Sequence, residues 1–221
     1  MNNTLGLILC FTYIFAMIGL AEGLRRRRGY GSSFTRKVIH IGVGMMSWFI
    51  PFLFTSPWPF VAACAAFMVI NLLDWRYGFI SAMQSSSRSN LGTVYFPLAA
   101  AVVALVFWEQ PPLMVAALMP LTWGDGLAPV IGAAYGKRIY RIHTSTRTLE
   151  GSAGFFVAGF VFTWLALWVV PGLPDITPTA ALLPALAIMA VTTLIEAVSI
   201  WGLDNLTVTA AAILILRGWP F

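Results

Sequence analysis

Apolar stretches long enough to cross a lipid bilayer recur along this chain and limit the folds open to it. A membrane-spanning helix needs about 20 consecutive, predominantly apolar residues. Of the 221 residues, 59% are hydrophobic and only 10% are charged, whereas soluble domains carry about 25% charged residues. We therefore predict an all-α, polytopic integral membrane protein that forms a single membrane-embedded domain over residues 1–221. Seven to eight transmembrane segments are expected, near residues 4–21, 36–54, 59–74, 93–108, 113–135, 151–170, 179–199 and 205–216.

The positive charges are distributed unevenly between the expected loops. When alternate loops are assigned to opposite sides of the membrane, twelve of the 13 Lys and Arg residues fall on one side and only Arg217 falls on the other. Because cytoplasmic loops carry an excess of Lys and Arg, this side is predicted to face the cytoplasm, with both termini on the opposite side. The basic cluster at residues 25–28 follows the first apolar run, so residues 1–24 are expected to remain as a transmembrane helix rather than act as a signal peptide.

One acidic residue, Asp125, is placed inside an expected transmembrane segment. Ionisable groups at membrane depth are rare and usually mark a functional site. Asp125 stands between Gly124 and Gly126, with a proline on either side. Irregular backbone within a bilayer is tolerated where it lines a cavity. The sequence therefore predicts that the fifth segment is broken at Gly124–Asp125–Gly126 and lines a cavity.

Glycines and basic residues follow Asp125 and suit a phosphate ligand. Gly132 and Gly136 would let a ligand approach the backbone closely. The alternative is that Gly132-x-x-x-Gly136 packs one helix against another and that the basic residues only set the topology. A Walker A loop is excluded, because three residues separate these glycines and Arg138 stands where Ser or Thr would bind magnesium. The basic residues that follow are Lys137, Arg138, Arg141 and Arg147.

The acidic side chains gather near the same side as the basic loops. This one-sided arrangement favours an enzyme that acts at the inner leaflet over a transporter, whose polar groups would more often lie at matched depths in two repeats. Carboxylates near phosphates generally need a cation between them, and Mg²⁺ takes carboxylate and phosphate oxygens. The sequence therefore predicts a magnesium site. The acids at this side are Asp74, Asp125, Glu150, Glu196 and Asp204, and Asn205 follows the last of them.

The second expected helix begins with a further candidate cluster. Arg36 and His40 are four residues apart and would share one helix face, with Lys37 beside them. This cluster could bind phosphate or hold a reacting hydroxyl group. Alternatively, the cations anchor the helix to anionic headgroups and His40 is an interior histidine. Before the fourth segment, Asn90 or Thr93 is expected to cap the helix, with a binding role as the alternative.

From Asp125 to Gly151 the chain reads D-x-x-A, three residues, G, three residues, G, a loop and then T-x-E-G. This spaced motif resembles the nucleotide-binding motif of the CTP-dependent lipid alcohol kinases. This family includes polyprenol and dolichol kinases, phytol kinase and the yeast-type diacylglycerol kinase. Its pattern is D-x-x-A, three residues, G, three residues, G, a short loop and K-K-T-x-E-G. Here the loop is one residue longer, and Thr146 and Arg147 replace the two lysines. The stretches RKVIHIG, NLGTVYFP and EAVSIWGLDNLTV also resemble the family, and the matching motif residues are Asp125, Ala128, Gly132, Gly136, Thr148, Glu150 and Gly151.

The resemblance implies a kinase that transfers the γ-phosphoryl group of CTP, or of another nucleoside triphosphate, to a lipid alcohol at the cytoplasmic face. The expected acceptor is an isoprenoid such as phytol, geranylgeraniol or a polyprenol. Asp125, with Glu150 or Asp204, would bind Mg²⁺, and one of the latter two carboxylates would receive the hydroxyl proton. His40 would orient phosphate or alcohol. Within a nucleotide-binding segment at 121–152 and beside it, the expected contacts are Gly124, Gly126, Ala128, Gly132, Gly136, Lys137, Arg147, Thr148, Gly151, Arg36, Lys37 and Asn205.

Two other functions use the same residues. A cytidylyltransferase would join CTP to a lipid phosphate with the same cation and carboxylate chemistry. A transporter or a structural membrane protein would use the irregular fifth segment as a pore or as a helix contact. Neither the composition nor the charge pattern implies a nucleic-acid partner.

Overall fold

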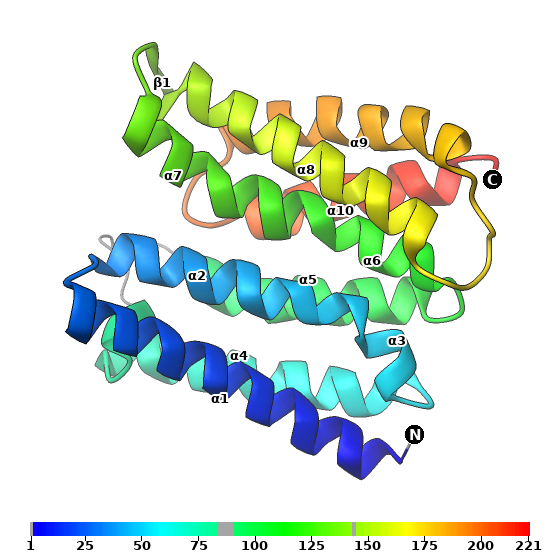
Figure 1. The fold of residues 1–221 in the computed structure, drawn as a ribbon, viewed down its shortest axis with the longest axis horizontal. Helices are drawn as coiled ribbons and strands as arrows, with labels where there is room; N and C mark the ends of the chain where they lie inside the picture. Colours follow the sequence, from blue (N-terminus) through cyan, green and yellow to red (C-terminus); the bar gives the residue numbers. More distant parts are fainter. Residues whose placement is uncertain (1, 84–90, 143–144) are drawn as a thin grey trace.

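The computed structural model describes residues 2–83, 91–142 and 145–221, and its helices lie side by side along the long axis of the molecule (Figure 1). Asn90, one of the two predicted helix caps, lies outside the described residues. The short helices η1 and η2 are 3-10 helices and η3 is a π-helix. In chain order the elements are α1 (Asn3–Arg28), α2 (Ser32–Met45), η1 (Met46–Trp48), α3 (Ile50–Leu53), α4 (Pro57–Tyr77), η2 (Ser81–Met83), α5 (Gly92–Phe107), α6 (Pro111–Met119), η3 (Pro120–Asp125), α7 (Gly126–Tyr135), β1 (Ile139–Ile142), β2 (Ser145–Thr148), α8 (Leu149–Val169), α9 (Pro178–Val198) and α10 (Asp204–Gly218).

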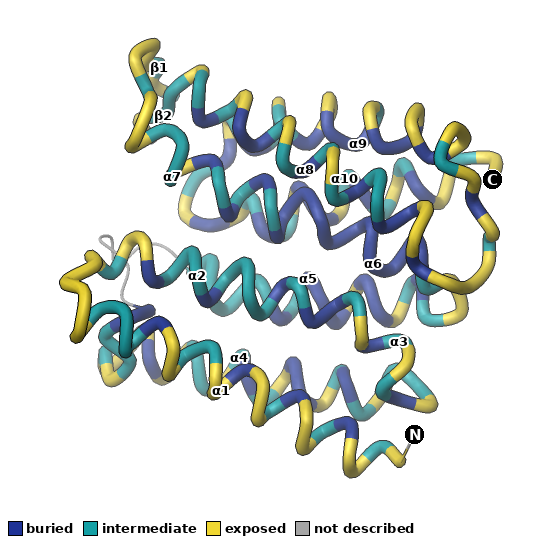
Figure 2. The backbone as a smooth tube through the Cα atoms, in the orientation of Figure 1, coloured by how far each residue is buried: buried dark blue, intermediate teal, exposed yellow. Residues whose placement is uncertain are grey.

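The eight predicted apolar segments are helical along most of their described length. The second is divided into α2, η1 and α3. Five helical stretches of the described chain are long and apolar enough to cross a membrane, namely α1, α4, Pro111–Tyr135, α8 and α9. The outer faces of α1, α4, α8 and α9 carry exposed aliphatic and aromatic side chains, as expected for surfaces in contact with lipid. Figure 2 shows these exposed positions along the outside of the bundle. The predicted fold class, an all-α polytopic membrane protein, is confirmed.

Capping and charged residues at its two termini explain where α1 begins and ends. The side chain of Asn2 accepts a hydrogen bond from the backbone N–H of Thr4 over 3.0 Å, which satisfies one of the free donors at the helix start. The helix ends at Gly29, whose φ of 69° is left-handed and costs glycine little. The last turn consists of Arg25–Arg28, and cations are favourable there because the carboxyl end of a helix carries partial negative charge.

The fifth segment is wound more widely at Asp125 rather than broken there, which corrects the prediction. Helical structure continues from Pro111 to Tyr135, and residues Pro120–Asp125 form a π-helical turn within it. A proline has no backbone N–H, so Pro120 cannot complete the regular hydrogen-bond ladder. The glycines on either side of Asp125 serve helix packing: a Cβ on Gly124 would lie 3.1 Å from the ring of Phe155, and one on Gly126 would lie 2.5 Å from Ile41.

A short β-hairpin occupies part of the segment that we expected to be a basic loop. Strands β1 and β2 are antiparallel, with Ile139 opposite Thr148 and Ile142 opposite Ser145. Ile, Tyr and Thr are enriched in strands, and exposed and half-buried residues alternate along β1. The hairpin matters for function because β2 delivers Arg147 and Thr148 to the space between the helices.

The basic connections gather at one end of the bundle. The Arg25–Arg28 end of α1 and the hairpin, which carry basic residues, lie at the same end as the α9–α10 connection, which carries none, while both chain termini lie at the other (Figure 1). This arrangement agrees with the predicted separation of basic loops from the termini.

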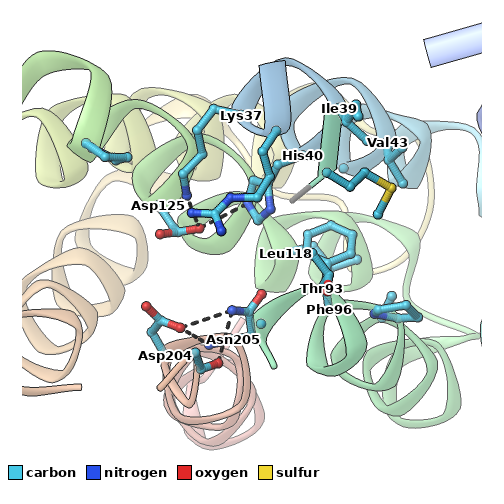
Figure 3. A pocket seen from close by; sticks show the side chains of 18 of the residues that line it. Lys37, Ile39, His40, Val43, Thr93, Phe96, Leu118, Asp125, Asp204 and Asn205 are labelled. Atoms are coloured by element: carbon cyan, nitrogen blue, oxygen red, sulfur yellow. Dashed lines mark hydrogen bonds and ion pairs between the residues drawn. The ribbon is translucent and has the colours of Figure 1, made fainter. Parts of the chain in front are cut away.

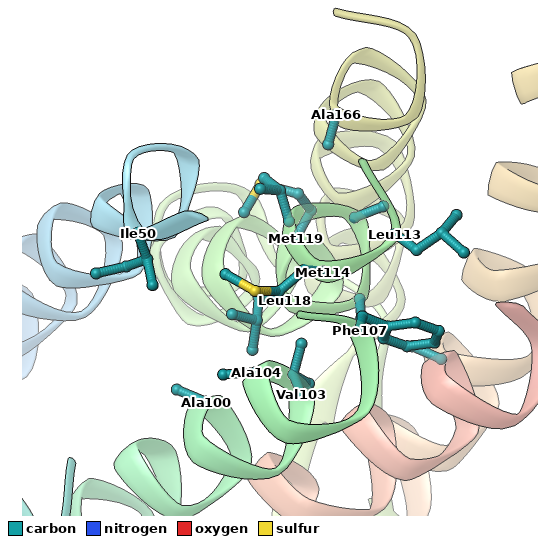
Figure 4. Packing of buried hydrophobic residues seen from close by; sticks show 14 of the residues in the cluster. Ile50, Ala100, Val103, Ala104, Phe107, Leu113, Met114, Leu118, Met119 and Ala166 are labelled. Carbon is teal, nitrogen blue, oxygen red and sulfur yellow. The ribbon is translucent and has the colours of Figure 1, made fainter. Parts of the chain in front are cut away.

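Helix α6 lies at the centre of the bundle and holds the π-turn in place. Every residue from Pro112 to Met119 is buried. Val103, Ala104 and Phe107 of α5 face α6 on one side, and Ala166 of α8 lies beyond it on the other (Figure 4). Because α6 continues directly into η3, this packing fixes the position of Asp125.

We predict that Gly151→Ala lowers thermal stability. An added Cβ would lie 2.9 Å from the backbone carbonyl oxygen of Ala128, so α7 and α8 would have to separate. Overpacking of this kind costs about 1–3 kcal/mol. The measurement is the unfolding temperature of the purified protein in detergent. Gly19→Ala is the matched control, because its Cβ would meet nothing within 4 Å on an exposed helix face. Equal unfolding temperatures for the two variants would contradict the close packing.

Candidate active site

A cavity of about 670 Å³ lies among the helices and has two chemically different parts. The part near the hairpin is lined by charged and polar side chains from α2, η3, β2, α9 and α10. The other part is lined almost entirely by apolar side chains from α1, α2, α4 and α5. Figure 3 shows the change between them: Asp125, Lys37 and Asp204 lie toward one side, and Val43, Leu118 and Phe96 toward the other. We call these parts the polar end and the apolar arm.

Asp125 is held at the polar end by two residues of α2. Its Oδ2 lies 2.8 Å from Nζ of Lys37 and 3.3 Å from Nε2 of His40. The side chains of Asp125 and Lys37 are only 15% and 11% exposed. An unpaired carboxylate at this depth would be costly, so the ion pair is what allows Asp125 to remain charged there. The predicted members Asp125, Lys37 and His40 are therefore brought together.

The ring of His40 has a defined orientation. Its Nε2 lies 2.8 Å from the carbonyl oxygen of Leu121. A carbonyl oxygen can only accept, so this contact assigns the hydrogen to Nε2. The ring also packs edge-on against Phe96, with 4.8 Å between centroids. His40 is thus a positioned interior histidine that borders both parts of the cavity.

Asp204 and Asn205 lie on the opposite side of the polar end from Asp125 (Figure 3). Oδ1 of Asp204 accepts hydrogen bonds from the backbone N–H and the side-chain amide of Asn205, over 2.9 and 3.0 Å. The same amide donates to the carbonyl oxygen of Gly202 over 3.1 Å. Oδ1 of Asn205 is buried and has no hydrogen-bond partner within the described residues. A buried oxygen of this kind usually marks a missing water, ion or ligand.

Arg147 reaches the polar end from β2 and is held by Glu196 of α9. The two side chains form an ion pair, and Nη2 of Arg147 donates to the carbonyl oxygen of Ser199 over 2.9 Å. The Nε of Arg147 is buried without a partner in the described part of the chain. Our sequence analysis counted Glu196 among the acids at this side but did not include it in the expected site residues, although an acid within the apolar run of α9 was a usable signal. Its position explains how a guanidinium group is fixed beside the cavity.

The motif residues of α7, β2 and α8 form one wall of the cavity. The side chain of Thr148 accepts a hydrogen bond from the N–H of Gly151 over 3.0 Å and so caps the start of α8. Helix starts present free N–H groups and favour anions such as phosphate. Gly132 is small because a Cβ there would lie 2.9 Å from Oγ1 of Thr148. The predicted residues of this wall that line the cavity are Ala128, Gly132, Arg147, Thr148 and Gly151.

Several predicted site residues are not part of the cavity lining. Glu150 is half-buried, and its carboxylate accepts hydrogen bonds from the backbone N–H groups of Lys137 and Arg138 over 3.0 and 3.2 Å. In this structure Glu150 therefore stabilises the turn after α7. The other predicted residues outside the lining are Gly124, Gly126, Gly136 and Lys137, whereas Arg36 is within it.

No group of three or more His, Cys, Asp and Glu side chains capable of holding a metal ion occurs among the residues that the structure describes. The predicted set of Asp125, Glu150 and Asp204 is accordingly not assembled as one cluster. Two of these carboxylates, with the unpartnered oxygen of Asn205, nevertheless line the same polar end.

The chain is similar to phytol kinases along nearly its whole length. A phytol kinase from Synechocystis sp. is 28% identical over 209 residues, which cover 94% of this chain and 88% of the relative. Probable chloroplastic phytol kinases from Triticum aestivum and Oryza sativa are 26% and 27% identical and cover 91% and 90% of this chain, and 72% and 68% of the relatives. No family model and no solved structure matches the chain. The resemblance inferred from the motif is confirmed.

We predict that Glu196→Ala lowers the stability of the protein. Removing one partner of a buried ion pair costs up to about 3–5 kcal/mol. The loss should be smaller here, because the Arg147 side chain is 20% exposed. The double variant Arg147→Met/Glu196→Leu leaves no unpaired charge and should recover most of the stability. Thermal unfolding in detergent measures both. A single variant as stable as the original protein would show that Glu196 does not hold Arg147.

Proposed function

Because this chain resembles the phytol kinases over nearly its whole length, we propose that it is a membrane kinase for lipid alcohols. Its reaction transfers the γ-phosphoryl group of CTP to the hydroxyl group of an isoprenoid alcohol such as phytol, geranylgeraniol or a polyprenol. The reaction takes place at the basic end of the bundle, which by the positive-inside rule faces the cytoplasm or the equivalent compartment.

The observation that carries this proposal is the two-part cavity. A lipid alcohol has an apolar chain and a hydroxyl group at one end, and a nucleotide presents a chain of phosphates. The apolar arm suits the first and the polar end suits the second, and they meet beside His40 and Phe96. Phosphoryl transfer depends mainly on positioning and on charge neutralisation, so bringing the two substrates together is the main task of the protein.

Cations at the polar end support the binding of the phosphates. Lys37 and Arg36 of α2 and Arg147 of β2 line the polar end from different sides. Arg147 presents a planar group that can bind phosphate oxygens with two parallel hydrogen bonds. Glu196 keeps that group in place. Arg147 therefore retains the positive charge that the lysines supply in the family motif.

The oxygen donors of the polar end fit Mg²⁺. This ion is typically bound by one or two carboxylates together with substrate phosphates and water. Asp125 supplies a carboxylate and Asn205 an amide oxygen that is buried without a partner in the described chain. When bound, Mg²⁺ would neutralise charge on the transferring phosphoryl group. Asp204, whose Oδ2 has no hydrogen bond within the described residues, is then the group that receives the hydroxyl proton.

The test is a transfer assay with purified protein in detergent, magnesium and CTP labelled on the γ-phosphate. Phytol, geranylgeraniol, a long polyprenol and diacylglycerol serve as acceptors. We expect label in a phosphorylated isoprenoid alcohol whose mass exceeds that of the alcohol by one phosphoryl group. A lipid product that instead carries label from α-labelled CTP would identify a cytidylyltransferase, and an absence of lipid product with CTP, UTP and ATP would contradict the kinase.

Asp125→Asn is expected to abolish most of this activity. The substitution removes the charge that faces the polar end but keeps the size of the side chain. Loss of one preorganised electrostatic group typically lowers kcat about 10²–10³-fold. Asp175→Asn is the matched control, since Asp175 is exposed in the α8–α9 connection at the other end of the bundle. Comparable activity of the two variants would remove Asp125 from the mechanism.

A further inference from the structure

The apolar arm runs along the axis of the bundle and has a measurable depth. On α4, both Asn71 at the polar end and Phe60 line the cavity. They are eleven residues apart, so at about 1.5 Å per residue they are separated by roughly 16 Å along the helix. Between them, Phe67 stacks on Phe11 of α1 with 4.9 Å between ring centroids, which fixes one wall of the arm.

The far end of the arm is closed by tightly packed side chains. Cys10 and Ile50, which line the cavity there, are each only 1% exposed, so the arm does not reach the surface beside them. Phe60 packs against Phe54, with 6.2 Å between ring centroids. Behind these rings α1 touches the end of α3, because a Cβ on Gly6 would lie 2.7 Å from the carbonyl oxygen of Leu53 and 2.9 Å from the ring of Phe54. A chain that reaches Phe60 cannot extend further.

This depth corresponds to a particular class of isoprenoid. The main chain of a diterpenoid alcohol has roughly sixteen carbons and advances about 1.25 Å per bond when extended, which gives about 19 Å. Such a chain would fill the arm from Phe60 to Asn71 and place its hydroxyl group in the polar end. A sesquiterpenoid would leave the far part empty, and a polyprenol would not fit.

We infer that Phe60, supported by Phe54 and Gly6, is a stop that limits the acceptor to diterpenoid length, and that Cys64 beside it sets the space available to the chain end. This inference rests on the proposed function for the identity of the acceptor, but it concerns residues far from the reacting groups. Phe60 and Cys64 are therefore specificity-determining residues rather than catalytic ones.

The two cysteines of the chain allow binding to be measured without the reaction. Cys10 and Cys64 are both free, buried and part of the arm. Because thiols buried among apolar side chains react slowly, an N-alkyl maleimide that enters the arm from detergent is applied for a long incubation at alkaline pH, and mass spectrometry reports the extent of modification. We expect phytol and geranylgeraniol to slow this modification more than farnesol does, and a long polyprenol to have little effect.

Substitutions in the arm should move the length preference in opposite directions. Phe60→Ala, or Phe60→Leu if the first variant does not fold, should extend both protection and phosphorylation to geranylfarnesol. Cys64→Phe should shift preference from phytol to farnesol by about tenfold or more in kcat/KM, because a single methylene in an apolar pocket discriminates by about 10–200-fold. Val69→Phe is the matched control, since it adds bulk to the same helix on a face that is 57% exposed.

The possible outcomes distinguish the chain-length limit at Phe60 from the proposed kinase activity. Equal protection and equal turnover with every alcohol, or a length preference that neither Phe60→Ala nor Cys64→Phe moves, would overturn the stop even if phosphorylation occurs. Length-dependent protection without any phosphorylated product would support the stop and contradict the kinase. A shift caused by Val69→Phe as large as that caused by Cys64→Phe would also overturn the assignment.

Discussion

The ion pair between Asp125 and Lys37 is the interaction on which the rest of the site depends. Removing a carboxylate from water costs several kcal/mol unless a partner compensates it. Lys37 supplies that compensation from α2, 88 residues away in sequence, at 2.8 Å. The pair therefore joins α2 to the helix that contains the π-turn, and it also keeps a charged acid where a cation and a phosphate chain can reach it. The same ion pair therefore serves both the stability of the fold and the chemistry of the site.

The fold could be predicted from sequence because bilayer thickness requires long apolar helices, which composition and spacing reveal directly. The tertiary contacts could not be predicted from the sequence. The glycines beside Asp125 were read as a break, but they accommodate Phe155 and Ile41 around a π-turn, and that packing depends on distant residues. The motif placed Glu150 in the site, whereas its carboxylate binds two backbone N–H groups of the preceding turn. Glu196 gained a role only when β2 brought Arg147 beside it.

The cavity separates charged groups from apolar side chains along the axis of the bundle. Charged groups at one end come from elements that lie close to the basic connections, while the arm is formed by the interiors of α1, α2, α4 and α5. A lipid can therefore keep its chain among apolar side chains while only its hydroxyl group enters the polar end. In the proposed reaction, magnesium and nucleotide need not leave the aqueous side. The close contact between Gly6 of α1 and Phe54 closes the arm. The packing of the helices therefore limits the length of the lipid chain in the proposed reaction.

The most direct test of this account is the binding of a bisubstrate ligand in which a phytyl group is joined through a phosphate chain to cytidine. With magnesium, we predict that this ligand raises the unfolding temperature more than CTP and phytol added together, because both parts of one cavity are filled at once. Asp125→Asn and Cys64→Phe, at opposite ends, should each reduce that gain. A bisubstrate ligand that stabilises no better than CTP alone, or whose effect only one of the two substitutions weakens, would contradict the single two-part site.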